Sequence, residues 1–318
     1  MPLEPALREL SKAIAGATPT LPSAEIDAAE ARRRAALRAS MARLIDGAAE
    51  PEQTVRWQDA QLRMRTTTTG NATGPLILYL HSGGWVAGST AATQRACRAL
   101  ADGLAATVVS LAYPLAPEQP YPAALDNTLA ALRWLASGES GLPGDPGTLI
   151  LAGESAGGNL AAAALLRLRD SGEPLPVQAA LLVVPVLDND FTRPSYQRFD
   201  RGDIDGRSGM HWYAQQYLAG HGGAEADSPY VWPLRSHRLG GLPPTVLVQA
   251  EYDPLVDEQS EWALRVSADG GLIKLLRYPG VGHSFFGLDH LSPTASRAQR
   301  DACAALADTL RSWQWSLG

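Results

Sequence analysis

Apolar residues in this chain gather in short runs that alternate with segments of helical periodicity. Near-continuous apolar runs are typical of strands buried on both faces, and they predict strands at residues 76–80, 107–112, 148–152, 180–184, 245–250 and 272–278. Apolar residues at helical spacing predict helices at residues 91–104, 122–136, 157–169, 256–268 and 295–314. Residues 54–66 alternate in part, which suggests two leading antiparallel strands. The pattern predicts an α/β fold with a mostly parallel sheet of about eight strands, flanked by helices.

Two segments interrupt this alternation. Residues 1–46 have helical patterns with no strand between them, and residues 187–243 separate two strands by far more than an ordinary connection. The aromatic residues of the second segment argue against disorder, among them Trp212, Tyr213, Tyr217, Tyr230 and Trp232. We therefore interpret residues 187–243 as a lid over a pocket, with Trp212 and Tyr213 as candidate pocket residues.

Charge and composition exclude several classes of partner. The net charge is −6 and no block of like charges occurs, so we expect neither a nucleic-acid nor an anionic-membrane partner. The arginines of residues 30–40 (EARRRAALRAS) follow acidic residues by a turn or two, which predicts a solvated helix face. The two cysteines, Cys97 and Cys303, lack further ligands at metal-binding spacing, so we expect buried thiols and no metal site.

Features of secreted and membrane-spanning chains are not found in the sequence. The N-terminal stretch MPLEPALREL carries acidic residues and no apolar core segment, unlike a signal peptide. No apolar run reaches the roughly 18 residues that a membrane-spanning helix needs. The sequence therefore predicts a cytoplasmic protein.

A candidate nucleophile follows the strand predicted at residues 148–152. Residues 153–158 read GESAGG, a Gly-x-Ser-x-Gly pattern between a predicted strand and a predicted helix. Glycines allow the sharp turn that lifts the hydroxyl of Ser155 clear of the sheet, and the helix start directs N–H groups at negative charge formed there. The motif alone is weak, since it also fits a plain tight turn, but its position between strand and helix favours a nucleophile.

A serine nucleophile needs a base, and the base needs an acid that orients it. Of the six histidines, His283 directly follows a predicted strand and is flanked by glycines in PGVGHSFFG. Among the acidic residues of AEYDPLVDE (250–258), Asp253 precedes a proline that keeps it in a loop, whereas Asp257 falls in the first helical turn, where a carboxylate offsets the helix dipole. Ser155, Asp253 and His283 all follow strands, at the edge of the sheet where ligands gather.

The loop at residues 81–88, here called the oxyanion loop, begins with HSGG after a predicted strand. Acyl transfer forms an oxyanion that needs preplaced donors, and we expect these to be the N–H groups of Gly83, Gly84 and Ala156. We interpret His81 as a brace whose ring binds the loop's own backbone. Trp85 is expected to pack against the pocket or the lid.

The sequence resembles the bacterial hormone-sensitive-lipase-like esterases of the α/β-hydrolase superfamily. The matching stretches are HSGG (81–84), YPLAPEQPYPAA (113–124), GESAGG (153–158), DPLVDE (253–258) and GVGHSF (280–285), in family order. The resemblance implies an α/β-hydrolase domain of residues 47–186 and 244–318, with a helical cap from residues 1–46 and the insertion 187–243. It implies Ser155 as nucleophile, His283 as base and Asp253 as acid. It also implies hydrolysis of short- to medium-chain esters without a cofactor, with a small-molecule ester as the partner. A homodimer through the last strand is a further implication of the resemblance.

Three positions depart from the family pattern. Ser82 replaces a glycine of the oxyanion loop, Glu154 replaces an aspartate beside the nucleophile, and Pro114 replaces an arginine. We expect Ser82 to have a negative φ angle, so that the serine is tolerated, and we place Ser82 and Glu154 in support of the loop. The loss of the arginine leaves Glu118 or Asp126 in need of another partner.

Two other functions fit the same residues. One is a relative that transfers acyl groups to alcohols or acts on a biosynthetic intermediate, and the other is a receptor that binds a small molecule without chemistry. All three triad positions are filled in this sequence. A carboxylesterase is therefore the leading hypothesis.

Overall fold

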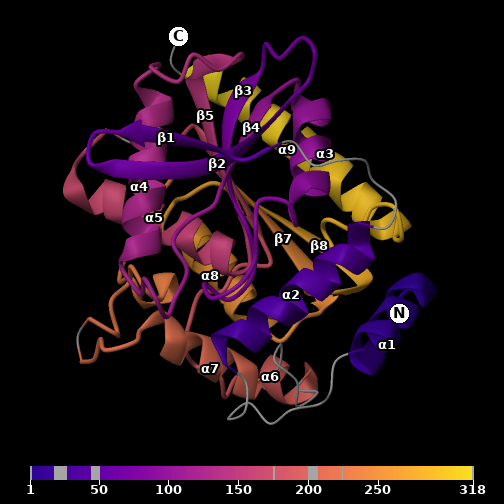
Figure 1. Cartoon of the computed structure of the whole chain (residues 1–318). Helices are drawn as coiled ribbons and strands as arrows, with labels where there is room; N and C mark the ends of the chain where they lie inside the picture. Colours follow the sequence, from indigo (N-terminus) through magenta and orange to yellow (C-terminus); the bar gives the residue numbers. More distant parts are fainter. Residues whose placement is uncertain are drawn as a thin grey trace.

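The computed structural model describes residues 2–17, 27–43, 51–174, 176–199, 207–223 and 225–316 (Figure 1). Within these ranges eight strands form one sheet in the order β1-β2-β4-β3-β5-β6-β7-β8. The strands are β1 (Gln53–Trp57), β2 (Ala60–Thr68), β3 (Pro75–Leu80), β4 (Thr107–Leu111), β5 (Asp145–Glu154), β6 (Ala179–Val183), β7 (Thr245–Tyr252) and β8 (Ile273–Gly282). Strand β2 pairs antiparallel with β1 and β4, and the remaining pairs are parallel. The predicted fold and mostly parallel sheet are confirmed.

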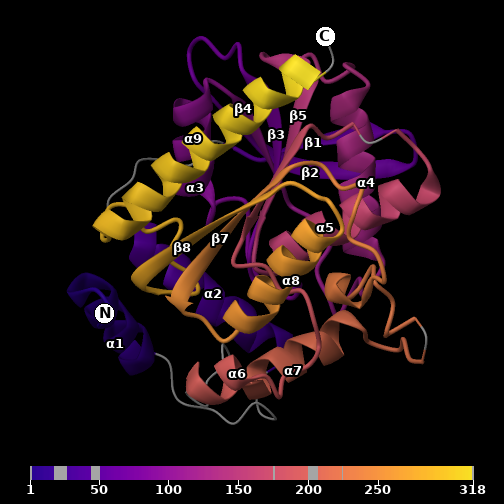
Figure 2. The ribbon, with the colours of Figure 1, turned by 180° about the vertical axis from the view of Figure 1, so that it is seen from behind.

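Helices cover both faces of the sheet, as Figures 1 and 2 show from opposite sides. One face carries α3 (Gln94–Leu104) and α9 (Pro293–Ser316), and the other carries α4 (Ala123–Ala136), α5 (Ala156–Ser171) and α8 (Val256–Ala268). Successive strand residues point to opposite faces. In β5, Leu149 and Leu151 therefore enter one core, and Ile150 and Ala152 enter the other. Both faces are apolar because both are covered, which explains the continuous apolar runs.

Four helices gather at one end of the sheet, where Figures 1 and 2 place them together. They are α1 (Pro5–Ala17) and α2 (Ala28–Arg43) near the N-terminus, and α6 (Pro194–Phe199) and α7 (Arg207–Tyr217) in the long connection between β6 and β7. Residues 1, 18–26, 44–46, 200–206 and 224 of the predicted cap segments lie outside the described residues. Among the helices that the structure describes, none has the length and apolar character needed to cross a membrane.

The connection between β6 and β7 contributes to the core as well as to the covering layer. Trp232, which precedes a short 3-10 helix at Pro233–Arg235, is 1% exposed and belongs to the same core cluster as the α4 and α5 side chains. Tyr217 at the end of α7 is also 1% exposed. Two of the aromatics that suggested a lid therefore belong to the core, where both rings contact Trp85 of the oxyanion loop.

Candidate active site

Ser155 sits in a strained turn between β5 and α5. Its backbone angles are φ +56° and ψ −114°, a conformation that a residue other than glycine rarely adopts. Neighbouring chain segments hold the turn in place: the Ser155 N–H donates to the Val183 carbonyl at 2.9 Å, and the Val186 N–H donates to the Ser155 carbonyl at 3.2 Å. The surrounding sheet thus fixes the hydroxyl at the edge where the strands end.

Gly157, in the first turn of α5, lets that helix approach the oxyanion loop. A Cβ atom built on Gly157 would lie 2.1 Å from the carbonyl oxygen of Leu80 and 2.7 Å from that of His81. Real Cβ atoms do not come so close to backbone oxygen, so any side chain would push the helix away from the loop. The glycine of the sequence motif is therefore required by the contact between α5 and the end of β3.

The hydroxyl of Ser155, the ring of His283 and the carboxylate of Asp253 form a hydrogen-bonded row. His283 Nε2 lies 2.8 Å from Ser155 Oγ, and His283 Nδ1 lies 3.0 Å from Asp253 Oδ2. Asp253 is 0% exposed, and its carboxylate also accepts hydrogen bonds from the Leu255 N–H at 2.9 Å and from Gln259 at 3.2 Å. Because a carboxylate accepts at Nδ1, Nδ1 carries the proton and Nε2 is left as an acceptor. His283 Nε2 can therefore accept the proton of the Ser155 hydroxyl.

Three N–H groups predicted as oxyanion donors lie around this row. Gly83 has φ +131° and Gly84 has φ +60°, while Ala156 begins α5. Among the described residues, the N–H groups of these three residues have no hydrogen-bond acceptor. Gly83 and Gly84 line the cavity that also contains Ser155 and His283. We therefore still expect these N–H groups to act as donors to negative charge formed beside the serine.

His81 contacts the backbone of its own loop. Its Nδ1 lies 2.8 Å from the Ser82 carbonyl oxygen, and its ring stacks on Tyr113 at 4.1 Å between centroids. Burial lowers the pKa of His81 to about 4, so the ring is neutral and its Nδ1 donates the proton of this bond. The Tyr113 hydroxyl in turn donates to the His81 carbonyl at 2.8 Å. Ser82 is not among the described residues with positive φ, which agrees with the conformation expected for it.

Trp85 lies in the core and not at the cavity. It is 0% exposed, stacks on Tyr217 at 4.5 Å between centroids, and its Nε1 donates to Asn159 Oδ1 at 3.3 Å. Asn159 also donates to the Val231 carbonyl at 2.8 Å. Of the two expected positions of Trp85, packing against the lid segment agrees with its contact with Tyr217 of the insertion, whereas its role as a substrate-pocket residue is corrected, because the turn after Gly84 directs the indole under the loop. Asn159, which the sequence analysis missed, joins α5, the oxyanion loop and the insertion.

A cavity of about 210 Å³ opens over Ser155. Its walls come from the strand ends and from the covering helices α1, α2 and α7: Leu10, Ala31, Arg34, Ala35, Ser82, Gly83, Gly84, Gly88, Ala92, Glu154, Val186, Met210, Tyr213, Pro254, Leu255, His283, Ser284, Gly287 and Leu288. Of the two aromatics proposed for the pocket, Tyr213 lines it, whereas Trp212 packs beside Tyr213 at 5.2 Å between ring centroids and does not.

Glu154 is the last residue of β5 and forms part of the cavity wall. Its carboxyl group accepts a hydrogen bond from the Tyr79 hydroxyl at 3.4 Å. Burial raises the pKa of Glu154 to about 7, against the opposing effects of the nearby His283 and of the Tyr79 bond. Glu154 therefore changes charge near neutral pH directly beside the nucleophile.

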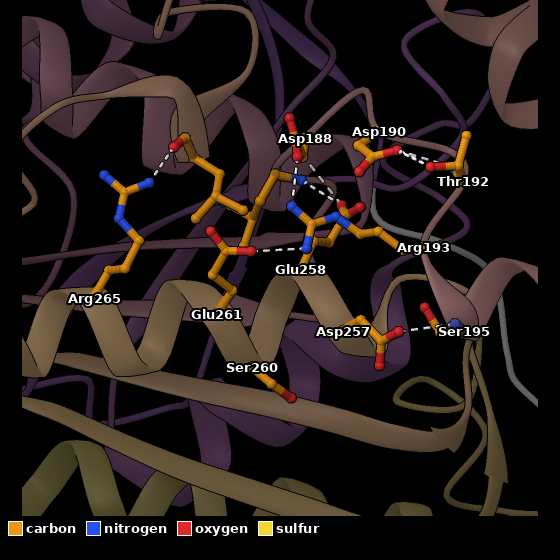
Figure 3. Close-up of polar contacts among 12 residues, drawn as sticks. Asp188, Asp190, Thr192, Arg193, Ser195, Asp257, Glu258, Ser260, Glu261 and Arg265 are labelled. Atoms are coloured by element: carbon orange, nitrogen blue, oxygen red, sulfur yellow. Dashed lines mark hydrogen bonds and ion pairs between the residues drawn. The ribbon is translucent and has the colours of Figure 1, made fainter.

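The remaining acids of the DPLVDE motif anchor the insertion to α8 (Figure 3). Asp257 accepts a hydrogen bond from the Ser195 N–H at 2.8 Å, and Glu258 accepts one from the Leu187 N–H at 2.7 Å. Glu258 is fully buried, and burial raises its pKa well above the ordinary value. Of these three acids, Asp253 is the one that contacts His283. The tertiary structure thus separates three carboxylates that stand within six residues.

Arg193 reinforces this anchor from the insertion. Its guanidinium donates to Asp188 at 2.6 Å and to Glu261 of α8 at 2.7 Å (Figure 3). Asp188 also accepts a hydrogen bond from Arg235 at 3.1 Å. The start of the insertion is therefore tied both to α8 and to its own later part, which holds the residues around Asp253 in place.

The arginines of α2 do not form the solvated face that the sequence suggested. Arg34 is 6% exposed, lines the cavity and donates to Glu30 at 2.6 Å. Arg32 reaches the oxyanion loop, and of the three α2 arginines whose side chains the structure describes, Arg33 is the one that stays on the surface, bound to Glu30. The helical spacing was compatible with a surface helix, but the sheet end beneath α2 buries one side of it.

Within the described ranges, His, Cys, Asp and Glu form no group of three that could hold a metal ion.

Comparison with known proteins agrees with this geometry. Residues 77–287 match a protein family described as alpha/beta hydrolase fold. The chain is 35% identical over 237 residues to the carboxylesterase NlhH of Mycobacterium tuberculosis, covering 74% of each chain. It is 32% identical over 212 residues to an ethyl acetate hydrolase of Pseudomonas putida, covering 67% of this chain and 66% of the relative.

Solved structures of esterases resemble the whole chain. A thermostable esterase from Pseudomonas putida superposes with a TM-score of 0.87 at 28% identity, covering 97% of this chain and 98% of that one. A hyperthermophilic esterase from Pyrobaculum calidifontis superposes with a TM-score of 0.82 at 30% identity, covering 96% and 98%. The similarity therefore includes the covering helices as well as the sheet.

Proposed function

This chain belongs to the bacterial hormone-sensitive-lipase-like carboxylesterases of the α/β-hydrolase superfamily, and from that premise we propose that it cleaves short- to medium-chain esters through an acyl-enzyme on Ser155. It is a carboxylic ester hydrolase, and its substrates are small-molecule esters. The observation that carries the proposed mechanism is the row Ser155–His283–Asp253, with contacts of 2.8 and 3.0 Å.

In the first half of the reaction, His283 takes the proton of Ser155 as the oxygen attacks the ester carbonyl. The carbonyl oxygen becomes negative and is stabilised by the N–H groups of Gly83, Gly84 and Ala156. Protonated His283 is stabilised by Asp253 and then gives its proton to the leaving alcohol. Ser155 is left as an acyl ester.

In the second half, a water molecule replaces the alcohol. His283 removes a proton from this water, which attacks the acyl group, and the same N–H groups stabilise the second oxyanion. Return of the proton to Ser155 releases the carboxylic acid. The buried carboxylate of Asp253 keeps the ring oriented throughout, because the Leu255 N–H and Gln259 hold that carboxylate in place.

The substrate range follows from the shape of the cavity. About 210 Å³ between the strand ends and α1, α2 and α7 suits a short or medium acyl chain. We propose that residues 1–46 and 187–243 act together as the cap over the catalytic domain of residues 47–186 and 244–318, since the described parts of both cap segments supply wall residues. The wall is largely apolar near Leu10, Met210 and Leu255, which favours an apolar chain.

We also propose a homodimer through the edge strand β8. Its outer side has no strand partner among the described residues, and three large apolar side chains on or near β8 and α8 are well exposed: Leu264, Leu272 and Leu275. Light scattering of the wild type and of the variant Leu272→Asp tests this assembly. A monomer in both would refute it and leave the esterase mechanism untouched.

A fluorophosphonate probe tests the mechanism directly, since it reacts only with an activated serine. We expect labelling of the wild type at Ser155, no labelling of Ser155→Ala, and strongly reduced labelling of His283→Ala. Rates on p-nitrophenyl esters from acetate to dodecanoate, with and without added alcohol, then separate hydrolysis from acyl transfer. A folded wild type that binds esters but is neither labelled nor active would be a receptor.

A further inference from the structure

Helix α2 contacts the oxyanion loop through the guanidinium group of Arg32. Arg32 Nε donates to the Val86 carbonyl at 2.8 Å, and Nη2 donates to the Ala116 carbonyl at 3.1 Å. The same group binds both carboxylate oxygens of Glu118, at 2.9 and 2.6 Å. Val86 belongs to the oxyanion loop, and the other two residues belong to the segment behind it. One side chain therefore joins the covering helix to both.

The acceptor positions determine the shape of the loop. The Ala116 N–H donates to the Trp85 carbonyl at 3.0 Å, so Arg32 and Ala116 together bind two successive carbonyls of the loop. In front of them, the N–H groups of Val86 and Ala87 both donate to the Gly83 carbonyl, at 3.2 and 2.9 Å. The turn that starts at Gly83 is thus closed at one end by its own N–H groups and held at the other by Arg32.

The Gly83 carbonyl sets the direction of an oxyanion donor. This carbonyl and the Gly84 N–H belong to the same planar trans peptide, in which the C=O and N–H bonds point in opposite directions. With the carbonyl held toward Val86 and Ala87, the Gly84 N–H is directed away from them. Gly84 lines the cavity beside Ser155, so this donor is available where the oxyanion forms.

We propose that Arg32 is a positioning residue for the oxyanion hole: through the Val86 and Ala116 carbonyls it fixes the peptide that presents the Gly84 N–H. This inference rests on the oxyanion role proposed above for Gly84. It makes the rate of the chemical step depend on the docking of α2, a helix of the predicted cap, and not only on the catalytic domain.

The pair with Glu118 orients the guanidinium more than it stabilises the fold. The Arg32 and Glu118 side chains are 35% and 59% exposed, and exposed ion pairs contribute little to stability. Position 114, which carries an uncharged proline, cannot supply a cation to Glu118, and Arg167 binds the neighbouring acid Asp126 at 2.9 Å. Arg32 of α2 therefore supplies Glu118 with the positive charge that position 114 lacks.

Steady-state kinetics of the full chain, with a trifluoromethyl ketone as an analogue of the tetrahedral intermediate, tests the proposal. For Arg32→Ala we expect kcat to fall about 10- to 100-fold, since a small misplacement of a reacting group has effects of this order. KM should change less than about threefold, and the affinity for the analogue should fall in parallel with kcat/KM. Free guanidinium should restore part of the lost rate.

Arg33→Ala is the matched control, because Arg33 is the next residue of the same helix and, among the described residues, binds Glu30 alone, on the surface. It should leave kcat and analogue affinity unchanged. Glu118→Gln should lower kcat by less than about threefold, since both carbonyl contacts of Arg32 remain. Should Arg32→Ala fail to fold, Arg32→Lys keeps the charge but not the fork of donors, and it should still lose kcat.

The outcomes separate this proposal from the mechanism on which it rests. If ester hydrolysis survives in Ser155→Ala, the proposed mechanism fails as a whole. If hydrolysis requires Ser155 but Arg32→Ala and Arg32→Lys keep wild-type kcat and analogue affinity, only the role of Arg32 is refuted. A loss confined to KM would also refute it, because Arg32 would then merely hold the cap over the substrate.

Discussion

The ring of Tyr213 lies directly against the α-carbon of Gly84. A Cβ atom built on Gly84 would lie 2.3 Å from Cδ1 of that ring, so a side chain at this position would displace either the ring or the peptide of the loop. Tyr213 also lines the cavity over Ser155. One contact therefore joins the insertion, the oxyanion loop and the substrate cavity, and it makes both residues sensitive to substitution.

Gly84→Ala should abolish most of the activity. The methyl group would displace either the Tyr213 ring or the peptide of the proposed oxyanion donor, and we expect kcat/KM to fall about 100-fold or more. Gly141→Ala is a control with the same backbone conformation, since Gly141 has φ +61° but nothing within 4 Å of the added carbon. It should lose about 1 kcal/mol of stability and no activity. Wild-type kcat/KM in Gly84→Ala would contradict a donor role for Gly84.

Asp253→Asn and Asp257→Asn should differ sharply in activity. Asp253 orients His283, so its amide variant should lower kcat by about 10⁴-fold. Asp257 accepts the Ser195 N–H at the junction with the insertion, so its variant should cost about 1 kcal/mol of stability and less than tenfold in kcat. Steady-state rates and urea unfolding of both variants check this. Equal losses of kcat would show that the acid is wrongly chosen.

Tyr213→Ala and Trp212→Ala should affect different properties. Tyr213 lines the cavity, so its removal should enlarge the site and shift the preferred p-nitrophenyl ester toward longer acyl chains. Trp212 is only 9% exposed and packs beside Tyr213 without lining the cavity, so its loss should mainly reduce stability, by about 3 kcal/mol. A shift in chain preference for Trp212→Ala alone would reverse this assignment.

Glu154 should make stability fall as the pH rises toward neutrality. Its pKa is about 7 in the folded protein and about 4.5 in an exposed chain, so the folded state binds more protons between these values. The stabilisation is complete below pH 4.5 and is lost as the pH rises through about 7. Glu154→Gln resembles the protonated side chain, so its advantage over the wild type should grow by roughly 2 kcal/mol between pH 5 and 8.

Urea unfolding of the two proteins across this range provides the measurement. Among the described residues, Tyr79, His283 and Cys97 are titratable groups whose charge interacts with that of Glu154. Because Glu154→Gln removes these interactions, the difference between the two proteins reports the titration of Glu154 together with its coupling to these groups. A constant difference between the wild type and Glu154→Gln would mean that Glu154 keeps one charge state throughout this range.

The sequence by itself determined the sheet, its flanking helices and the order of the site residues. Continuous apolar runs that alternate with helical periodicity predict strands covered on both faces, and a Gly-x-Ser-x-Gly turn between strand and helix places the serine at the end of the sheet. The same reasoning singled out His283 and Asp253, because each follows a strand, and the strand ends of a parallel sheet meet at one edge. These are local signals, and local chemistry suffices to read them.

Only the tertiary structure decided which side chains meet across long distances in the chain. Trp85 was expected to pack against the pocket or the lid, and the structure buries it against Tyr217 of the insertion, away from the cavity. Arg32 and Arg34 were expected on a solvated helix face. In the structure, Arg32 donates to backbone carbonyls beneath α2, and Arg34 forms part of the cavity wall. Periodicity reports which side of a helix is apolar, and it carries no information on which distant polar groups lie beneath an arginine. Docking of the covering helices supplies that information, because it places charged side chains over backbone carbonyls that strand patterns do not reveal.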